Sequence, residues 1–291
     1  MLTEIEISQL VQMTCAMEVS APKPGNVNRR HDFERSTFEE FLLSGIAIGP
    51  AFADAGRSTV GEIILNAVLA SKKHYRSNTN LGIILLLAPL AKACLAASDF
   101  NDIRTKLQKT LDALTIEDAE LAYEAIRIAN PGGLGLVAKA DIGEKPTIPF
   151  LEAMAFAKER DSIAWEYATN YEITFEIGLP ALKTALSRGA SSPNAIVQAY
   201  LSMLSRIPDS HIARKKGIDA AEVVSLKAAQ IILRGGIFTE KGLMGIEAFD
   251  QFLRAPSQSL NPGTSADLTA AAIFLNLVSE SLPINFCNSR C

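Results

Sequence analysis

Polar side chains that interrupt an apolar helical pattern are the first candidates for chemistry, because a buried polar group needs a partner. Asp267 is such a case, since residues 261–268 open a strongly apolar helical segment. In the first turn of a helix a carboxylate is stabilised by the dipole, and against a core it also requires a cation or donors. Asp267 is therefore a candidate catalytic residue or metal ligand, and Gly263, Thr264 and Ser265 beside it are candidates for substrate binding.

A second cluster packs a carboxylate, an imidazole and a guanidinium into residues 208–214. Such groups can move protons or bind charged ligands, so Asp209, His211 and Arg214 are functional candidates. The alternative is that His211 lies on an ordinary surface turn.

A third candidate is the loop that follows the first predicted helix. Lys23 lies between two prolines, the second of which is Pro24, and the loop continues through Gly25 to His31 and Asp32. The prolines stiffen the backbone, so the ammonium group can be aimed at a phosphate, and the glycine permits close backbone approach. The pattern indicates an anion site, with an ordinary solvated loop as the alternative.

A fourth segment, residues 77–82, opens the most apolar helical stretch of the chain with Asn78, Thr79, Asn80 and Gly82. Such residues normally cap free backbone N–H groups, and the same N–H groups can bind an anion with help from the helix dipole. The sequence leaves both roles open. In a fifth segment Asp161 is predicted to cap a helix.

The same fifth segment contains Trp165, the single tryptophan of the chain. A tryptophan is usually a core anchor, and the alternative is that its ring stacks on adenine.

The elements that position these residues are predicted to be helices, because apolar residues recur at helical spacing and no clear period-two run occurs. The fold class is therefore all-α, a compact domain of about a dozen helices over residues 1–282, with a tail at 283–291. After an N-cap at Ser36 or Thr37 the next helix should end at Gly56 in a left-handed conformation. Residues 130–149 form a long irregular segment, either a linker or a flap over a site. The predicted helices span 4–19, 37–56, 60–74, 81–97, 100–114, 116–129, 150–157, 162–171, 175–187, 193–206, 220–233, 240–253 and 265–282.

Composition excludes several classes of protein. The formal net charge of −4 and the pI of about 5.6 give no basic field for DNA or RNA, so small-molecule nucleotides are the expected partners and nucleic acid is not. Residues 1–9 carry no basic region of a signal peptide, and the apolar run 81–90 is too short to cross a membrane. We expect a cytoplasmic protein with buried or tail thiols and no membrane segment, and the many apolar helices make a homodimer reasonable.

Common nucleotide and hydrolase motifs are absent from the sequence. It contains no P-loop, no strand-linked G-x-G-x-x-G, no H-E-x-x-H and no G-x-S-x-G elbow. An ordinary kinase or dehydrogenase is therefore a poor interpretation of this helical chain.

Taken in chain order, four of these segments resemble the triphosphoribosyl-dephospho-CoA synthase family. Residues 22–27 with the following His and Asp resemble its P-K-P-G-x-V motif, residues 78–82 its N-T-H-K-G, residues 209–214 its D-[ST]-x…R segment and residues 262–268 its P-G-G-S-A-D-L. Asn80 and Leu81 replace a His and a Lys of that pattern, and Thr264 replaces a Gly, so the chain resembles a divergent branch. Leu81 lacks the positive charge of the lysine in that pattern, which bears on the identity of the acceptor more than on the type of reaction.

The resemblance implies a transferase that cleaves the adenine–ribose bond of ATP and passes the triphosphoribosyl group to 3′-dephospho-CoA or a related nucleotide. Such a reaction needs a carboxylate near C1′ and an acid near adenine, for which Asp209 and Asp267 are the candidates. Mg²⁺ would assist the triphosphate together with Lys23 and Arg214, and Asp209 and Asp267 are the candidate ligands of this ion. The general base that takes the proton of the attacking hydroxyl is His31, Asp32 or His211, and the sequence does not decide among the three.

Two alternatives to this transferase remain open. The first is a nucleotide N-glycosidase or another ribosyltransferase, and the second is an ATP-binding protein without turnover. A purely structural helical protein is disfavoured, because so many polar residues gather at the starts of apolar helices. We expect Lys23, Asn78, Asp209 and Asp267 to converge on one pocket.

Overall fold

The chain folds into helices, as the apolar periodicity predicts. The computed structural model describes residues 1–33, 36–73, 79–132, 139–256 and 260–282. Within these ranges there are two isolated β-bridges, Asn28–His31 and Phe33–Ser36, and no strand. The prediction of an all-α fold is therefore confirmed.

The helix boundaries follow the predicted ones closely in most of the chain. Between residues 37 and 56 the structure forms two helices rather than one, and the second begins at Gly49. One short helix, formed by residues 210–216, has no counterpart in the predicted set. The elements are α1 (Glu4–Ser20), α2 (Phe38–Ala47), α3 (Gly49–Phe52), α4 (Val60–Lys72), α5 (Leu81–Ala96), η1 (Phe100–Asp102), α6 (Ile103–Asp112), α7 (Ile116–Ala129), α8 (Phe150–Ala157), α9 (Ser162–Ala168), η2 (Thr174–Gly178), α10 (Leu179–Ser187), α11 (Ser192–Leu204), α12 (Ser210–Lys216), α13 (Ile218–Leu233), η3 (Gly236–Phe238), α14 (Glu240–Arg254) and α15 (Gly263–Ser281).

The predicted left-handed stop at Gly56 is wrong. Gly56 is not among the residues with positive φ. It lies where a side chain would collide with the Glu4 carboxylate, which accepts a hydrogen bond from the Gly56 N–H at 3.0 Å. The glycine is thus explained by close approach of α1 rather than by helix termination.

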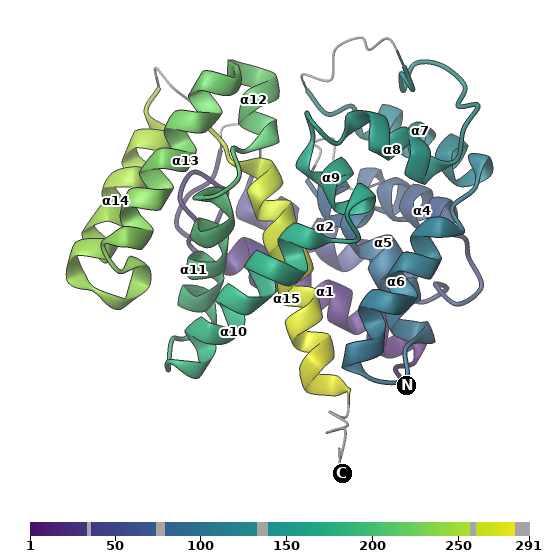
Figure 1. The fold of residues 1–291 in the computed structure, drawn as a ribbon, viewed down its shortest axis with the longest axis horizontal. Coiled ribbons are helices and arrows are strands. Elements are labelled where there is room, and N and C mark those ends of the chain that lie inside the picture. The colour runs from purple at the N-terminus through teal and green to yellow at the C-terminus, as the bar shows by residue number, and fades with distance from the viewer. Residues whose placement is uncertain (34–35, 74–78, 133–138, 257–259, 283–291) are drawn as a thin grey trace, which may run out of the picture.

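Helix α15 runs through the middle of the molecule and organises the rest (Figure 1). It packs against α1 and α5 on one side and against α10 and α11 on the other. One large apolar core surrounds α1, α4, α5, α7 and α15, and a smaller core joins α11, α13 and α14. None of the helices in the described ranges combines the length and the apolar character needed to cross a bilayer.

Several helices begin with reciprocal side-chain caps. Thr37 Oγ1 accepts from the Glu40 N–H and Glu40 Oε2 accepts from the Thr37 N–H, both at 3.3 Å, which confirms the N-cap at the start of α2. The same capping box opens α1, α4 and α7. Each box satisfies free donors at a helix start, which stabilises the helix by about 1 kcal/mol.

Helix α5 tolerates an internal proline because a tyrosine hydroxyl replaces the lost backbone donor. Pro89 has no N–H, so the carbonyl of Leu85, four residues earlier, loses its helical donor. Tyr167 Oη donates to that carbonyl at 2.6 Å, and Tyr171 Oη donates to the Leu86 carbonyl at 2.7 Å. Both tyrosines come from the α9 region, so these bonds fix α9 against the helix that starts at the candidate site.

Candidate active site

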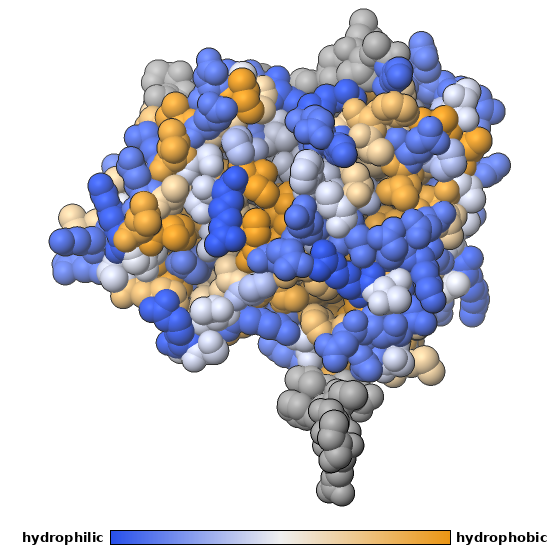
Figure 2. Space-filling model, viewed as in Figure 1, coloured by the Kyte–Doolittle hydropathy of each residue, from blue (hydrophilic) through white to orange (hydrophobic). Residues whose placement is uncertain are grey.

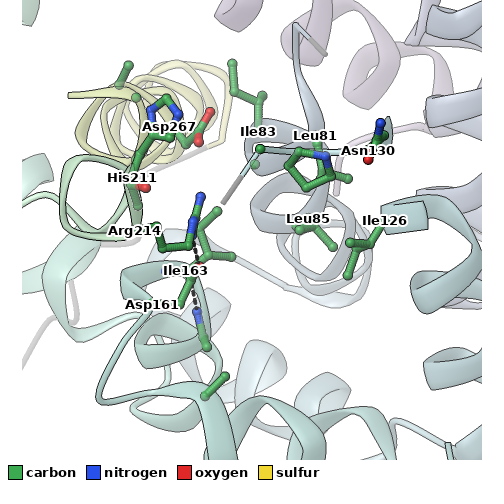
Figure 3. Close-up of a pocket in the computed structure, with 18 of the residues that line it drawn as sticks. Leu81, Ile83, Leu85, Ile126, Asn130, Asp161, Ile163, His211, Arg214 and Asp267 are labelled. Carbon is green, nitrogen blue, oxygen red and sulfur yellow. Dashed lines mark hydrogen bonds and ion pairs between the residues drawn. The ribbon is translucent and has the colours of Figure 1, made fainter. Parts of the chain in front are cut away.

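A cavity of about 450 Å³ lies between α1, α5, α7, α8, α9, α12 and α15. Figure 3 shows Asp267, His211 and Arg214 on one side and the apolar side chains of Leu81, Leu85 and Ile126 on the other. The cavity is of the size and mixed polarity typical of small-molecule sites. The described ends of the irregular segment, residues 130–132 and 140–142, line it as well.

Asp267 is an acid of this cavity whose surroundings disfavour its ionised form. It lies in the first turns of α15, and its carboxylate is packed so closely on Gly82 of α5 that any Cβ at position 82 would collide with it. Within the described part of the chain, no hydrogen bond or ion pair reaches the Asp267 carboxylate. Burial raises its pKa well above the ordinary range, Glu18 and Asp209 raise it further, and Arg214 opposes them. The surroundings of Asp267 therefore favour the protonated form of its carboxyl group.

Glu18 is a second acid on the cavity wall, and it has a partner. It lies at the end of α1 with 5% of its surface exposed, and its Oε1 is 2.9 Å from the Lys23 ammonium. Lys23 is fully buried behind it, where it also donates to the Glu18 backbone carbonyl. Lys23 thus does not line the cavity, and its charge is committed to Glu18 rather than open to a phosphate.

The rest of that loop supports the cavity from outside. Gly25 has φ of +76° and its N–H donates to Asp250 Oδ1 of α14 at 2.7 Å. Asn26, the next residue, lines the cavity and donates through Nδ2 to Asn261 Oδ1 at 2.7 Å. Its own Oδ1 is buried without a partner. The loop therefore contributes an open amide oxygen to the site.

Three other predicted residues of the loop lie away from the cavity. Pro24 is buried outside the lining. His31 is half exposed, with its Nε2 3.7 Å from Asp250 Oδ2, and Asp32 accepts from the Phe38 N–H at 2.7 Å. Neither His31 nor Asp32 reaches the site as a base, because residues 29–32 are exposed and the chain lines the cavity again only from Phe33.

His211 is the histidine that the structure brings to the cavity. It lies on α12, the helix that the sequence pattern did not reveal, and its Nδ1 is 3.1 Å from the Asn261 carbonyl oxygen. A carbonyl accepts only, so Nδ1 carries a hydrogen and Nε2 of the neutral ring is left as an acceptor. Burial lowers the pKa of His211 to about 4, with Lys215 and Arg214 lowering it further. The ring is therefore neutral at physiological pH.

Arg214 lies one turn further along α12 and pairs with Asp161. Its Nη1 contacts Asp161 Oδ2, while Asp161 Oδ1 accepts from the Ile163 N–H at 2.9 Å and so caps α9 as predicted. The Nε of Arg214 is buried without a hydrogen-bond partner. Arg160 and Lys215 also line the cavity, so three cations lie along one edge of it.

Asp209, the other predicted acid, is turned into the protein. Its surface is 1% exposed, Oδ1 accepts from the Ile212 N–H at 2.9 Å, and Oδ2 accepts from the Ser265 N–H and Oγ at 2.7 and 2.8 Å. Asp209 and Ser265 therefore join α12 to the start of α15, and neither lines the cavity.

The proposed pair of Mg²⁺ ligands is consequently not formed. Asp209 does not reach the cavity, and burial favours the neutral form of Asp267, which is a poor ligand for a hard cation. Over the described ranges, no group of three or more His, Cys, Asp or Glu side chains could hold a metal ion. These residues do not fit a resident Mg²⁺ site.

The first turns of α5 and α15 meet at the cavity, and the residue that precedes each helix, Asn80 or Pro262, does not cap it with its own side chain. Leu81, Gly82 and Ile83 of α5 line it together with Gly263 and Thr264 of α15. Helix starts of this kind present N–H groups and a positive dipole to a bound anion.

The other residues of the α5 start have different positions. Thr79 lines the cavity, and its Oγ1 is bonded to the Ser44 hydroxyl at 2.6 Å. Asn80 is buried outside the lining and bonds to the same hydroxyl. Asn78 lies outside the described residues.

The sequence interpretation missed Glu18, Asn26, Arg160 and Lys215 as site residues. For Glu18 a signal exists, because Ile7, Val11, Thr14 and Glu18 follow one buried stripe of α1 at helical spacing. A charged residue at such a position is a functional candidate. Trp165 does not line this cavity, and it packs against the core.

Comparisons with known proteins show the family to which the chain belongs. The family model described as ATP:dephospho-CoA triphosphoribosyl transferase matches residues 4–286. A relative from Malonomonas rubra, described as "Probable 2-(5''-triphosphoribosyl)-3'-dephosphocoenzyme-A synthase", is 24% identical over 94% of this chain and 88% of its own length. A relative from Klebsiella pneumoniae, described as "2-(5''-triphosphoribosyl)-3'-dephosphocoenzyme-A synthase", is 28% identical over 35% of this chain and 36% of its own length.

A solved structure agrees with them. The crystal structure of an Archaeoglobus fulgidus protein, described as a triphosphoribosyl-dephospho-CoA synthase, has a TM-score of 0.63 and 30% identity, covering 82% of this chain and 98% of that chain. The chain therefore belongs to the ATP:dephospho-CoA triphosphoribosyl transferase family, and triphosphoribosyl transfer is its activity.

Proposed function

We propose that the transfer takes place in the cavity lined by Asp267 and that Asp267 is the acid that gives its proton to the departing adenine. The observation that carries the proposal is a half-buried carboxyl group with no partner in the described chain and a raised pKa. A general acid must hold its proton at working pH, and burial beside other acids supplies that property. The adenine ring would pack against the apolar wall formed by Leu81, Leu85 and Ile126.

Glu18 would have the complementary role. Loss of adenine leaves positive charge at C1′, which an ionised carboxylate stabilises. The Glu18 carboxylate lies on the cavity wall and is paired with Lys23. The two acids thus have different roles, because Asp267 donates a proton and Glu18 stabilises positive charge.

His211 is the proposed acceptor of the hydroxyl proton. The acceptor oxygen forms its bond to C1′ while the C1′–N9 bond breaks and its electron pair leaves with adenine. The oxygen becomes strongly acidic as this bond forms, so even a weak base such as the Nε2 of His211 can take the proton. One proton is lost by the hydroxyl and one is gained by adenine, so the step balances.

The triphosphate would lie at the starts of α5 and α15, with Arg214, Arg160 and Lys215 beside it. Helix N-termini and guanidinium groups are suited to phosphate oxygens. Mg²⁺ would enter with ATP as part of the substrate, held by phosphate oxygens and water as is usual for this ion.

The test is chromatographic detection of free adenine after incubation with Mg·ATP and 3′-dephospho-CoA, with and without the acceptor. We expect adenine only when the acceptor is present, and a rate lower by about 10²–10⁴-fold in Asp267→Asn. Asp219→Asn changes an exposed aspartate of α13 outside the cavity and should have no effect.

Other outcomes would replace the proposal. Adenine release without acceptor would indicate an N-glycosidase, and binding without any release would indicate a nucleotide-binding protein. An unchanged rate in Asp267→Asn would refute the role of Asp267.

A further inference from the structure

A second cavity, of about 770 Å³, lies on the other side of the Arg214–Asp161 ion pair. Arg160, Asp161 and Arg214 line both cavities and form a wall common to the two. The region between α9 and α12 is on the face shown in Figure 2, where apolar side chains are visible between charged ones. The second cavity is therefore adjacent to the proposed active site and shares with it a wall of three charged side chains.

The lining of the second cavity has the chemistry that binds a nucleotide. Trp165 supplies an aromatic ring, and its Nε1 donates to Glu172 Oε2 at 3.2 Å, which fixes the orientation of the ring. Ile173 and Ile207 supply apolar surface next to it. An aromatic face with apolar neighbours can stack on a purine.

Cations in the second cavity are available to phosphate. Within the described chain, the side chains of Arg206 and Arg160 make no hydrogen bond or ion pair, and the Nε of Arg214 is buried without a partner. Guanidinium groups bind phosphate oxygens through paired, charge-assisted hydrogen bonds. Two guanidinium groups and one buried donor thus face a space that also offers an aromatic ring.

We infer that the second cavity binds the adenosine diphosphate portion of the acceptor, with the ribose hydroxyl that is to be glycosylated at the common wall. This inference rests on the proposed function, since it assigns the two nucleotides of the reaction to two neighbouring cavities. ATP occupies the cavity lined by Asp267, and the acceptor reaches ATP across the Arg214–Asp161 pair. An adenosine diphosphate moiety occurs in both substrates, so the test must distinguish them.

Trp165 provides the measurement, because it is the only tryptophan of the chain and lies in the second cavity. The full chain is titrated separately with 3′-dephospho-CoA, ATP and 4′-phosphopantetheine while tryptophan emission is recorded. We expect a saturable change with dephospho-CoA at lower concentration than with ATP, and none with phosphopantetheine. Saturation at lower concentration with ATP, or an equal response to phosphopantetheine, would overturn the assignment.

Arg206→Ala tests the same site in a second way. Arg206 is exposed just beyond the end of α11, so its replacement should leave the fold intact. Loss of a charge-assisted contact should raise Kd and KM for dephospho-CoA about tenfold and leave KM for ATP unchanged. Arg57→Ala, which removes an exposed arginine that lines neither cavity, is the matched control. An unchanged Kd and KM in Arg206→Ala would overturn the inference.

The adenine assay separates this inference from the proposed function. Normal adenine release with no response of Trp165 to dephospho-CoA would refute the second cavity alone. A saturable change of Trp165 emission in a protein that releases no adenine would refute the proposed reaction and support nucleotide binding in the second cavity.

Discussion

Asp267→Asn should make the protein more stable while it slows transfer by about 10²–10⁴-fold. Asp267 is buried enough to lose solvation, it has no partner in the described chain, and Glu18 and Asp209 repel its charged form. Asparagine has nearly the same shape and cannot ionise, so it removes the repulsion and keeps the packing on Gly82. A residue that costs stability and lies in a cavity is typical of a catalytic group.

We expect a gain of about 1–3 kcal/mol, the range that mutational data give for relieving an unfavourable buried polar or charged group, because the amide avoids the proton uptake or buried charge that the acid requires near neutral pH. For a chain of this length, each kcal/mol shifts Tm by roughly 2 °C, so the variant should melt about 2–6 °C higher. The gain should depend on pH. The raised pKa means that the folded wild type binds a proton more readily than the unfolded chain, so this contribution is present in acid and is lost as pH rises from about 4.

The assay is differential scanning calorimetry of both proteins without nucleotide and with EDTA, at several values of pH between acid and neutral. We expect the difference in Tm to be small in acid and to grow toward neutral pH. A variant that melts lower than wild type, or a gain that is the same at every pH, would show that Asp267 is not an unpaired buried acid.

Three further changes test other parts of the site. His211→Gln should lower kcat about 10²–10⁴-fold, and because the pKa of His211 is lowered to about 4, the wild-type pH–rate profile should show no step near pH 6.5; such a step would refute the assignment. Gly82→Ala should lower adenine release at least tenfold with helix content unchanged in circular dichroism, because the new methyl group would displace the Asp267 carboxylate, and full activity would contradict that packing. Tyr167→Phe should cost about 1–3 kcal/mol in chemical denaturation by leaving the Leu85 carbonyl without a donor, and an unchanged midpoint would show that the bond contributes nothing.

The fold class could be predicted because apolar spacing at 3.6 residues is a local property of the chain. The same spacing does not predict helix α12, because seven residues, three of them basic, are too short to show a period. Helix α12 carries both His211 and Arg214, so the helix that was not predicted is also the one that brings a histidine to the cavity. The split between α2 and α3 does have a local signal, because the Gly49-Pro50 dipeptide interrupts helices and Pro50 stands in the first turn of α3.

The site was predicted in part, and the errors have a common physical origin. Asp209 and Asp267 are similar in sequence, since each lies at or near the start of a helix. The difference between them is tertiary, because Ser265 donates twice to Asp209 and no described residue donates to Asp267. A sequence shows where a carboxylate stands along a helix, and it does not show which donors the rest of the fold brings to it.

The loop at residues 22–25 also affects the acids of the cavity without lining it. Lys23 was expected to bind phosphate, and its ammonium lies instead against Glu18, which converts one acid of the cavity into a paired carboxylate. Asp209 is likewise held by donors from α12 and α15. Asp267 alone of these three acids is left without a partner in the described chain, so its proton is the one that a substrate can take. The loop lysine and the α15 serine thus act on Asp267 indirectly, because each satisfies a neighbouring acid and leaves no donor for the third.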